Sequence, residues 1–109
     1  MTYTKLMLID PSVEDNPLGG YAEKWLEFME QNHPELLAEL VANKTLVAVA
    51  RSVDDSAWAY RELLDTQYME HNPRPEVSFE KIAAWERTRA FYTDSAVMRE
   101  KVLIPRTVT

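Results

Sequence analysis

The residues of this chain that could do chemistry are few and widely spaced. Glu30 and His33 have the Glu-x-x-His spacing of carboxylate-bridged metal bundles, but such sites need two of these motifs and further glutamates on facing helices. His33 precedes a proline at a predicted helix end, and His71 follows Glu70 at the end of the next predicted long helix. Both positions are typical of capping or surface histidines. The chain has no cysteine, which excludes thiolate metal sites, cysteine nucleophiles and disulfides.

Other catalytic patterns are also missing from the sequence. It contains no H-E-x-x-H, G-x-S-x-G or P-loop motif, and none of its five serines has a recognisable activating context. Gly19-Gly20 alone is typical of a hinge or a helix cap. We therefore expect a protein that is not an enzyme and that carries no cofactor and no metal.

Rows of acidic side chains are a candidate site of another kind. Residues 1–80 hold fifteen acids against six bases, whereas residues 81–109 hold three acids against six bases, which gives the net charge of −6. The rows could imitate a nucleic-acid backbone, or they could be the solvated backs of ordinary amphipathic helices, the interpretation that we favour. The candidate partner-binding residues in these rows are Glu23, Glu27, Glu30, Glu35 and Glu39.

Aromatic residues supply the remaining candidates. Trp58 neighbours an apolar stripe that runs through Ala57, and we add it to the candidate partner-binding residues. In the carboxyl-terminal segment, bases from Lys81 to Arg106 interleave with Trp85, Phe91 and Tyr92, as in tracks on which nucleic-acid bases stack. These aromatics fall at core spacing, however, and the acidic body should be repelled by a phosphate backbone, so direct nucleic-acid binding is not expected.

The elements that would position these residues are mostly helices. Apolar residues at helical spacing predict a helix over about 20–32, in which Trp25 faces the core, and Pro34 predicts the start of a second helix that frays at Asn43-Lys44. Residues 46–50 fit a strand or a helix, and we favour the helix. At the N-terminus we predict a strand over Tyr3–Ile9 and a loop over 13–20. A further helix begins at Ser52 and ends near His71, and an extended connector follows over 72–75. The last helix is capped by Ser78, places Trp85, Phe91 and Tyr92 in the core, and has a break at 93–95.

The fold class is therefore mainly α, a small domain of about four helices with a short N-terminal strand. With 109 residues the chain is long enough for one core, and we divide its single domain into a strand and loop (1–20), a helical body (21–71) and a C-terminal helix (79–104). No stretch approaches about 18 apolar residues and no secretory leader is evident, so we expect a cytoplasmic protein that does not span a membrane. It should fold alone or as a small oligomer.

Several stretches, covering a little over half of the chain, resemble the small transposon-encoded TnpV-type proteins of mobile elements. The matching residues are Tyr3-Thr4-Lys5, His33-Pro34, Leu36-Leu37, Leu40, Lys44, Leu46, Asp55-x-Ala57, the helix around Trp85, Val97 and Val102-Leu103-Ile104. The resemblance implies a helix-rich protein carried by mobile DNA, with no catalytic residues to transfer. Where the family tends to be basic, this chain has Glu23, Glu27 and Glu30, and Asn43-Lys44 replaces a usual Ser-Gly-Lys turn.

Two functional hypotheses follow. The first is a non-enzymatic accessory protein of a mobile genetic element that works by protein–protein contact through helix faces. The second is an acidic inhibitor of a host nucleic-acid-binding defence system, of the anti-CRISPR or anti-restriction kind, that occupies a basic groove. Both predict a protein partner, either from the mobile element or from host defence.

Overall fold

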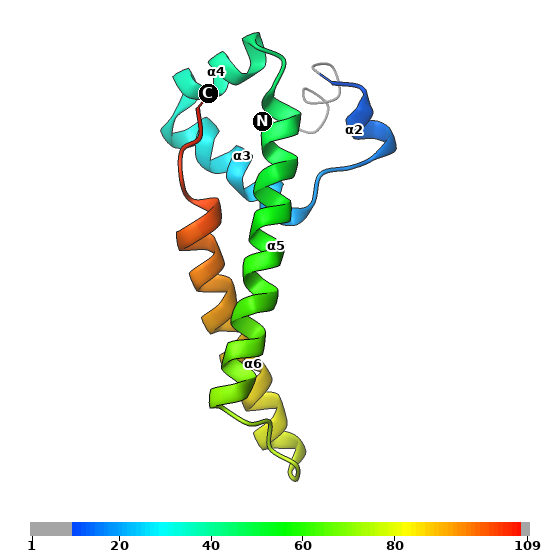
Figure 1. Cartoon of the computed structure of the whole chain (residues 1–109), viewed down its shortest axis with the longest axis vertical. Coiled ribbons are helices and arrows are strands. Elements are labelled where there is room, and N and C mark those ends of the chain that lie inside the picture. Colours follow the sequence, from blue (N-terminus) through cyan, green and yellow to red (C-terminus); the bar gives the residue numbers. More distant parts are fainter. Residues whose placement is uncertain (1–9, 108–109) are drawn as a thin grey trace.

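The structure is a computed structural model that describes residues 10–107. About 78% of these residues are helical, and no strand occurs among them. Five α-helices and one π-helical turn follow each other along the chain (Figure 1): α2 (Ser12–Asp15), α3 (Gly20–Asn32), α4 (Pro34–Ala42), α5 (Leu46–His71), α6 (Phe79–Val97) and η1 (Met98–Val102).

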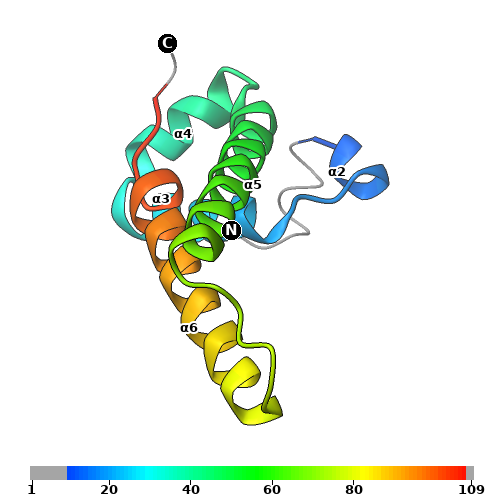
Figure 2. The same ribbon diagram turned by 60° about the horizontal axis from the view of Figure 1, so that its bottom comes forward.

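The molecule is elongated and measures 54 × 26 × 20 Å, and its longest helix is α5, with 26 residues. Helices α3 and α4, η1 and the C-terminal end of α6 gather around the first half of α5, while the second half of α5 and the start of α6 project away as a helical hairpin (Figures 1 and 2). Residues 65–92 are called the arm below, and the rest of the described chain is called the head.

The core lies in the head. Its largest fully buried side chains include Trp25 and Met29 of α3, Leu40 of α4 and Val53 of α5. Trp25, predicted to face the core, also donates a hydrogen bond from Nε1 to the carbonyl oxygen of Ile104, 3.2 Å away. This contact joins the segment after η1 to α3, so the C-terminal segment packs against the same core as α3.

The N-terminal region differs from the prediction. The predicted strand over Tyr3–Ile9 lies outside the described residues, and the predicted loop over 13–20 contains the short helix α2. The Asp10 carboxylate accepts a hydrogen bond from the Ser12 backbone N–H (3.0 Å), and Val13 is fully buried. The Asp10 carboxylate and the buried Val13 side chain thus stabilise α2. This helix is too short to show helical periodicity in the sequence, so the prediction of about four helices missed it.

Helix α5 begins six residues earlier than the N-terminus predicted at Ser52. Leu46, Ala50, Val53 and Ala57 form one unbroken buried stripe, so residues 46–50 are helical as favoured, but there is no break after them. The Ser52 hydroxyl donates to the carbonyl oxygen of Val49 (2.7 Å), as serines inside helices often do. The predicted end of α5 at His71 is confirmed.

The last helix, predicted over 79–104, is continuous through the predicted break; α6 ends at Val97, and η1 continues it as a π-helical turn to Val102. Ser78 caps α6 as expected, since its hydroxyl accepts from the Lys81 backbone N–H (3.4 Å). The predicted break at 93–95 is wrong, because Thr93 is buried and its hydroxyl donates to the Arg89 carbonyl (3.0 Å), which lets the helix pass through.

Two aromatic residues of α6 are not in the core. Phe91 and Tyr92 are mostly exposed, contrary to their predicted core positions. Trp85 is half-buried: it packs on Tyr68 and donates from Nε1 to the Asn72 carbonyl (2.7 Å). Core spacing identified an apolar face of α6, but within residues 10–107 no third element covers it in this part of the hairpin.

Candidate functional site

The five candidate glutamates are all exposed. Glu23, Glu27 and Glu30 lie on the side of α3 that faces away from Trp25 and the core, while Glu35 and Glu39 lie on the exposed part of α4. Between residues 20 and 42 the only base is Lys24. The head therefore presents a strongly acidic surface over these two helices.

Trp58, the sixth candidate, packs against two neighbouring side chains although 47% of its surface is exposed. Its ring meets the edge of Tyr21 with 5.2 Å between the ring centroids, and the Arg61 guanidinium lies 5.3 Å from the Trp58 ring centroid. The cation over the ring is an attractive arrangement. Next to this cluster is a shallow pocket of about 150 Å³, which Lys24 and Asp94 also line.

Tyr21 connects the Trp58 cluster to α6. Its hydroxyl donates to Oδ1 of Asp94 (3.0 Å) and accepts from Nη1 of Arg61 (2.8 Å), so one phenol links α3, α5 and α6. Burial raises the pKa of Tyr21, the hydrogen bond to Asp94 raises it further, and Arg61 acts in the opposite direction. The phenol therefore stays protonated near neutral pH and serves as a donor.

Charged side chains continue this link into the arm. Asp65 lies 3.9 Å from Nε of Arg61 and 2.7 Å from Nη1 of Arg89, whose Nη2 is 2.8 Å from Glu86. Hydrogen bonding to Glu86 is the main cause that raises the pKa of Arg89. Asp65, Arg61 and Arg89 are partly shielded from water, so the cluster positions the arm against the head.

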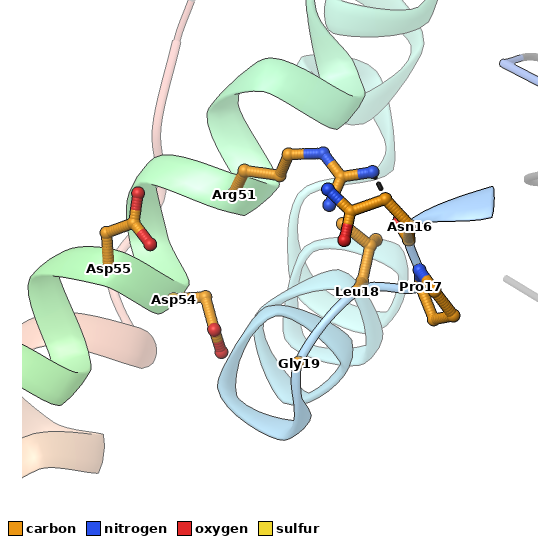
Figure 3. A pocket seen from close by; sticks show the side chains of 7 residues that line it. All are labelled: Asn16, Pro17, Leu18, Gly19, Arg51, Asp54 and Asp55. Atoms are coloured by element: carbon orange, nitrogen blue, oxygen red, sulfur yellow. Dashed lines mark hydrogen bonds between the residues drawn. The ribbon is translucent and has the colours of Figure 1, made fainter. Parts of the chain in front are cut away.

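A second pocket, of about 300 Å³, lies between the segment before α3 and helix α5 (Figure 3). On one side, Arg51 reaches across and donates from Nη2 to the Asn16 carbonyl (2.5 Å). On another, Asp54 points toward the start of α3 and accepts from the Ala22 backbone N–H (3.3 Å). Asp54 thus caps α3 from a different helix, where Gly19 has no side chain to do so.

Gly19 is required by this cap. A Cβ at Gly19 would overlap the Asp54 carboxylate, whereas a Cβ at Gly20 would meet nothing within 4 Å. The interpretation of Gly19-Gly20 as a helix cap is therefore confirmed, but the partner is a carboxylate 35 positions along the chain. The pocket is explained by helix capping and loop anchoring, and it brings no nucleophile and base together.

The two histidines lie at helix ends. His33 separates α3 from α4 and its ring packs against Phe28, with 5.4 Å between the ring centroids, while Nδ1 of His71 lies 2.8 Å from the Gln67 carbonyl oxygen. Over residues 10–107, no three His, Asp or Glu side chains are grouped as metal ligands would be. The same part of the chain holds no helix with the length and apolar character to cross a bilayer.

The basic residues of the carboxyl-terminal segment are largely occupied within the molecule. Arg89 is paired with two carboxylates, Lys101 lies 5.1 Å from the Tyr60 ring centroid, and Arg106 donates to the Lys101 carbonyl (3.3 Å). The bases from Lys81 to Arg106 are thus distributed over the arm and the head.

The sequence did not reveal Asp54, Arg61, Asp65 and Arg89 as a set. Asp54 lies two residues after the helix start predicted at Ser52, but its carboxylate caps α3 instead. The other three appear in sequence as ordinary surface charges. Their helical spacings, such as Arg61 and Asp65 four residues apart, are the one local signal that they interact.

The fold and these contacts define a class: a small helical protein with an acidic head, an exposed tryptophan and a projecting helical arm. The family of the transposon-encoded protein TnpV matches residues 1–103 of the chain, so the chain belongs to this family. The resemblance found in the sequence is thereby confirmed, and the protein is associated with transposons. No curated protein and no solved structure matches the chain.

Proposed function

We propose that the protein is a non-enzymatic accessory protein of its transposon that acts by protein–protein contact centred on Trp58. The observation that supports this most is that Trp58 is half exposed yet fixed between Tyr21 and Arg61. Tryptophan, tyrosine and arginine are the residue types in which the binding energy of protein interfaces is concentrated.

The packing of the cluster favours binding. A partner that covers Trp58 would not have to fix a mobile side chain, because neighbours from α3 and α5 already hold the ring, and this lowers the entropy cost of association. The adjacent pocket is too small for most cofactors but could accept one side chain of a partner. Lys24, Arg61 and Asp94 provide polar groups at its edge.

A capture experiment tests the proposal. The tagged protein would be expressed in cells that carry the transposon, cross-linked and purified, and the bound proteins would be quantified for wild type, Trp58→Ala and Leu63→Ala. Leu63 is a matched control because it is also an exposed apolar residue of α5. We expect Trp58→Ala to reduce the transposon-encoded partner at least tenfold and Leu63→Ala to leave it unchanged. Equal recovery with both variants would contradict the proposal.

The exposed glutamates favour a second candidate function, that of an acidic inhibitor which occupies the basic groove of a host nucleic-acid-binding protein. All five lie on α3 and α4, where Lys24 is the only base. Such binding would be steered by charge and weakened by salt, since the Debye length falls from about 10 Å at 0.1 M to about 3 Å at 1 M.

A triple charge reversal distinguishes the two functions. Glu23→Lys, Glu27→Lys and Glu39→Lys together should abolish capture of a defence protein if the acidic surface binds. If the Trp58 cluster binds, the triple variant should capture its partner almost normally, and binding should survive 1 M salt because burial of apolar surface does not depend on screening.

A further inference from the structure

The arm exposes an apolar face that the head does not cover. Helix α6 faces α5 through residues such as Thr93 and Val97, which are buried. Its opposite side carries Ala84, Thr88 and Phe91, all exposed. With Ser95, which is half-buried and lies just beyond the arm, these residues follow each other at intervals of four, three and four, the spacing of a helix seam that pairs with another helix. Ala84, Thr88, Phe91 and Ser95 are called the outer stripe; none is charged.

Exposed aromatic rings of α6 supply part of the area that a stable interface requires. Phe91 of the outer stripe is 76% exposed, and Tyr92 beside it, which also contacts Tyr68, is 52% exposed. Phe79, at the tip of the arm and about 120° around the helix from Phe91, is 86% exposed. At about 200 Å² per ring, these three residues alone expose roughly 400 Å², about half of the ~800 Å² that each partner buries in a standard interface. Val77, Leu103 and Ile104 are also exposed and would add to this area.

We propose that the outer stripe pairs with the outer stripe of a second copy of this chain, with the two α6 helices antiparallel about a two-fold axis between Thr88 and Phe91. In this register each Phe91 ring packs over Thr88 of the second copy, and each Ala84 lies opposite Ser95. A large side chain thus meets a small one at the centre of the interface, and the same contact occurs twice, as in a closed dimer. The two hairpins together complete a four-helix bundle.

Charge selects this orientation. Arg87 and Asp94 are seven residues apart on one flank of the outer stripe, and in the antiparallel register Arg87 of each copy faces Asp94 of the other. Over residues 10–107, Arg87 forms no other ion pair, and Asp94 has a second carboxylate oxygen besides the one bonded to Tyr21. In a parallel pair each flank would face the opposite flank of the other copy, so Arg87 would not lie next to Asp94 of that copy.

The distribution of charge over the molecule supports the same partner. The arm is almost neutral, with five acids against four bases, whereas α3 and α4 carry five acids and one base. Antiparallel arms place the two acidic heads at opposite ends of the pair, where they repel each other least. The exposed Val77 and Phe79 at the tip of one arm would then lie near the exposed Leu103 and Ile104 of the other copy.

Sedimentation equilibrium from 1 to 200 µM tests the pairing. Trp58 lies on α5 outside the outer stripe, and Asp94 is the one residue that both the pocket beside Trp58 and the proposed charge pair use. We expect the wild type to dimerise within this range, Phe91→Glu to raise the dissociation constant at least 100-fold, and the matched control Leu63→Glu to leave it unchanged. Arg87→Glu should raise it about tenfold, because two favourable charge pairs become repulsive. Circular dichroism checks that each variant is folded.

Cross-linking tests the orientation. The chain has no native cysteine, so the variant Ala84→Cys/Ser95→Cys contains only two thiols, about 16 Å apart along one helix and unable to bond within it. Oxidation should give dimers whose tryptic peptides join position 84 to position 95. A wild type that is monomeric at 200 µM, a dimer that survives Phe91→Glu, or links that join 84 to 84 and 95 to 95 would each overturn the proposal.

Discussion

The head and the arm both contain large apolar residues but are stabilised differently. All residues that are fully buried lie in the head, and from residue 65 to residue 92 none is buried. The arm nevertheless contains Trp85, Phe91 and Tyr92, and its helices are as regular as those of the head. Apolar content therefore does not distinguish the two regions.

What distinguishes them is the number of elements that meet. In the head, α3, α4 and η1 all pack around α5, so a side chain such as Trp25 is enclosed from several sides. In the arm only α5 and α6 face each other, and two helices can bury only the narrow stripe between them. Ion pairs between Asp65, Arg89 and Glu86 take over part of the role that apolar packing has in the head.

Two tryptophan substitutions should separate the regions most clearly. Trp25→Ala should reduce the free energy of unfolding by about 3–5 kcal/mol, because it leaves a large cavity in the core. Trp85→Ala in the arm should cost only about 1–2 kcal/mol, since the ring is half-buried against Tyr68. Urea denaturation measures both. Equal losses would mean that the arm has a core of its own.

The cap of α3 offers a test of long-range contact within the head. Asp54→Ala should cost about 1 kcal/mol, and Gly19→Ala should cost a similar amount because the added Cβ displaces the same carboxylate. The double variant should cost little more than either single one, whereas fully additive losses would show that the two residues do not share a contact. Gly20→Ala, where there is space, is the matched control and should be neutral or slightly stabilising.

The pH dependence of the stability that Tyr21 contributes tests the junction between head and arm. Because the pKa of Tyr21 is raised above its ordinary 10.0, the folded state favours the protonated phenol, and this contribution is present below pH 10 and lost as the pH rises through the folded pKa. Tyr21→Phe should cost about 1 kcal/mol at pH 7. The difference between the two proteins should shrink above pH 10 in thermal denaturation, and a difference that grows there would contradict the assigned cause.

Phe91→Ser should have the smallest effect of all on the folded monomer. In dilute solution, where wild type and variant are both monomeric, the free energy of unfolding should change by no more than about 0.5 kcal/mol, because the ring is mostly exposed. Chemical denaturation at 1 µM measures this. A loss near that of Trp25→Ala would show that Phe91 packs inside the monomer.

Much of the helical architecture could be predicted from local patterns. The first long helix, the proline at the start of α4, the end of α5 at His71 and the Ser78 cap all depend on residues close in sequence. The short helix α2 and the continuity of α5 through Ser52 could not, because tertiary burial of Val13 and Val53 decides them. Periodicity located the apolar face of α6 but could not show that Phe91 is left exposed by the part of the chain that the structure describes.

The site was predictable to a lesser degree. Exposure of the five glutamates followed from their helical spacing, and Trp58 was selected because it neighbours an apolar stripe. The cap by Asp54 and the link from Tyr21 through Arg61 to Asp65 join residues from different helices, so they depend on how the helices cross. No pattern along one helix contains that information.

Hydrogen exchange tests most directly whether stability resides in the head and contact surface in the arm. It should be measured residue by residue on Phe91→Glu, which we expect to be monomeric. Amides of α5 in the head, from about residue 50 to residue 57, should exchange only through global unfolding. Amides of α6 in the arm, from about residue 83 to residue 92, should exchange through local openings that cost at least about 2 kcal/mol less. Equal protection in both stretches would contradict the account.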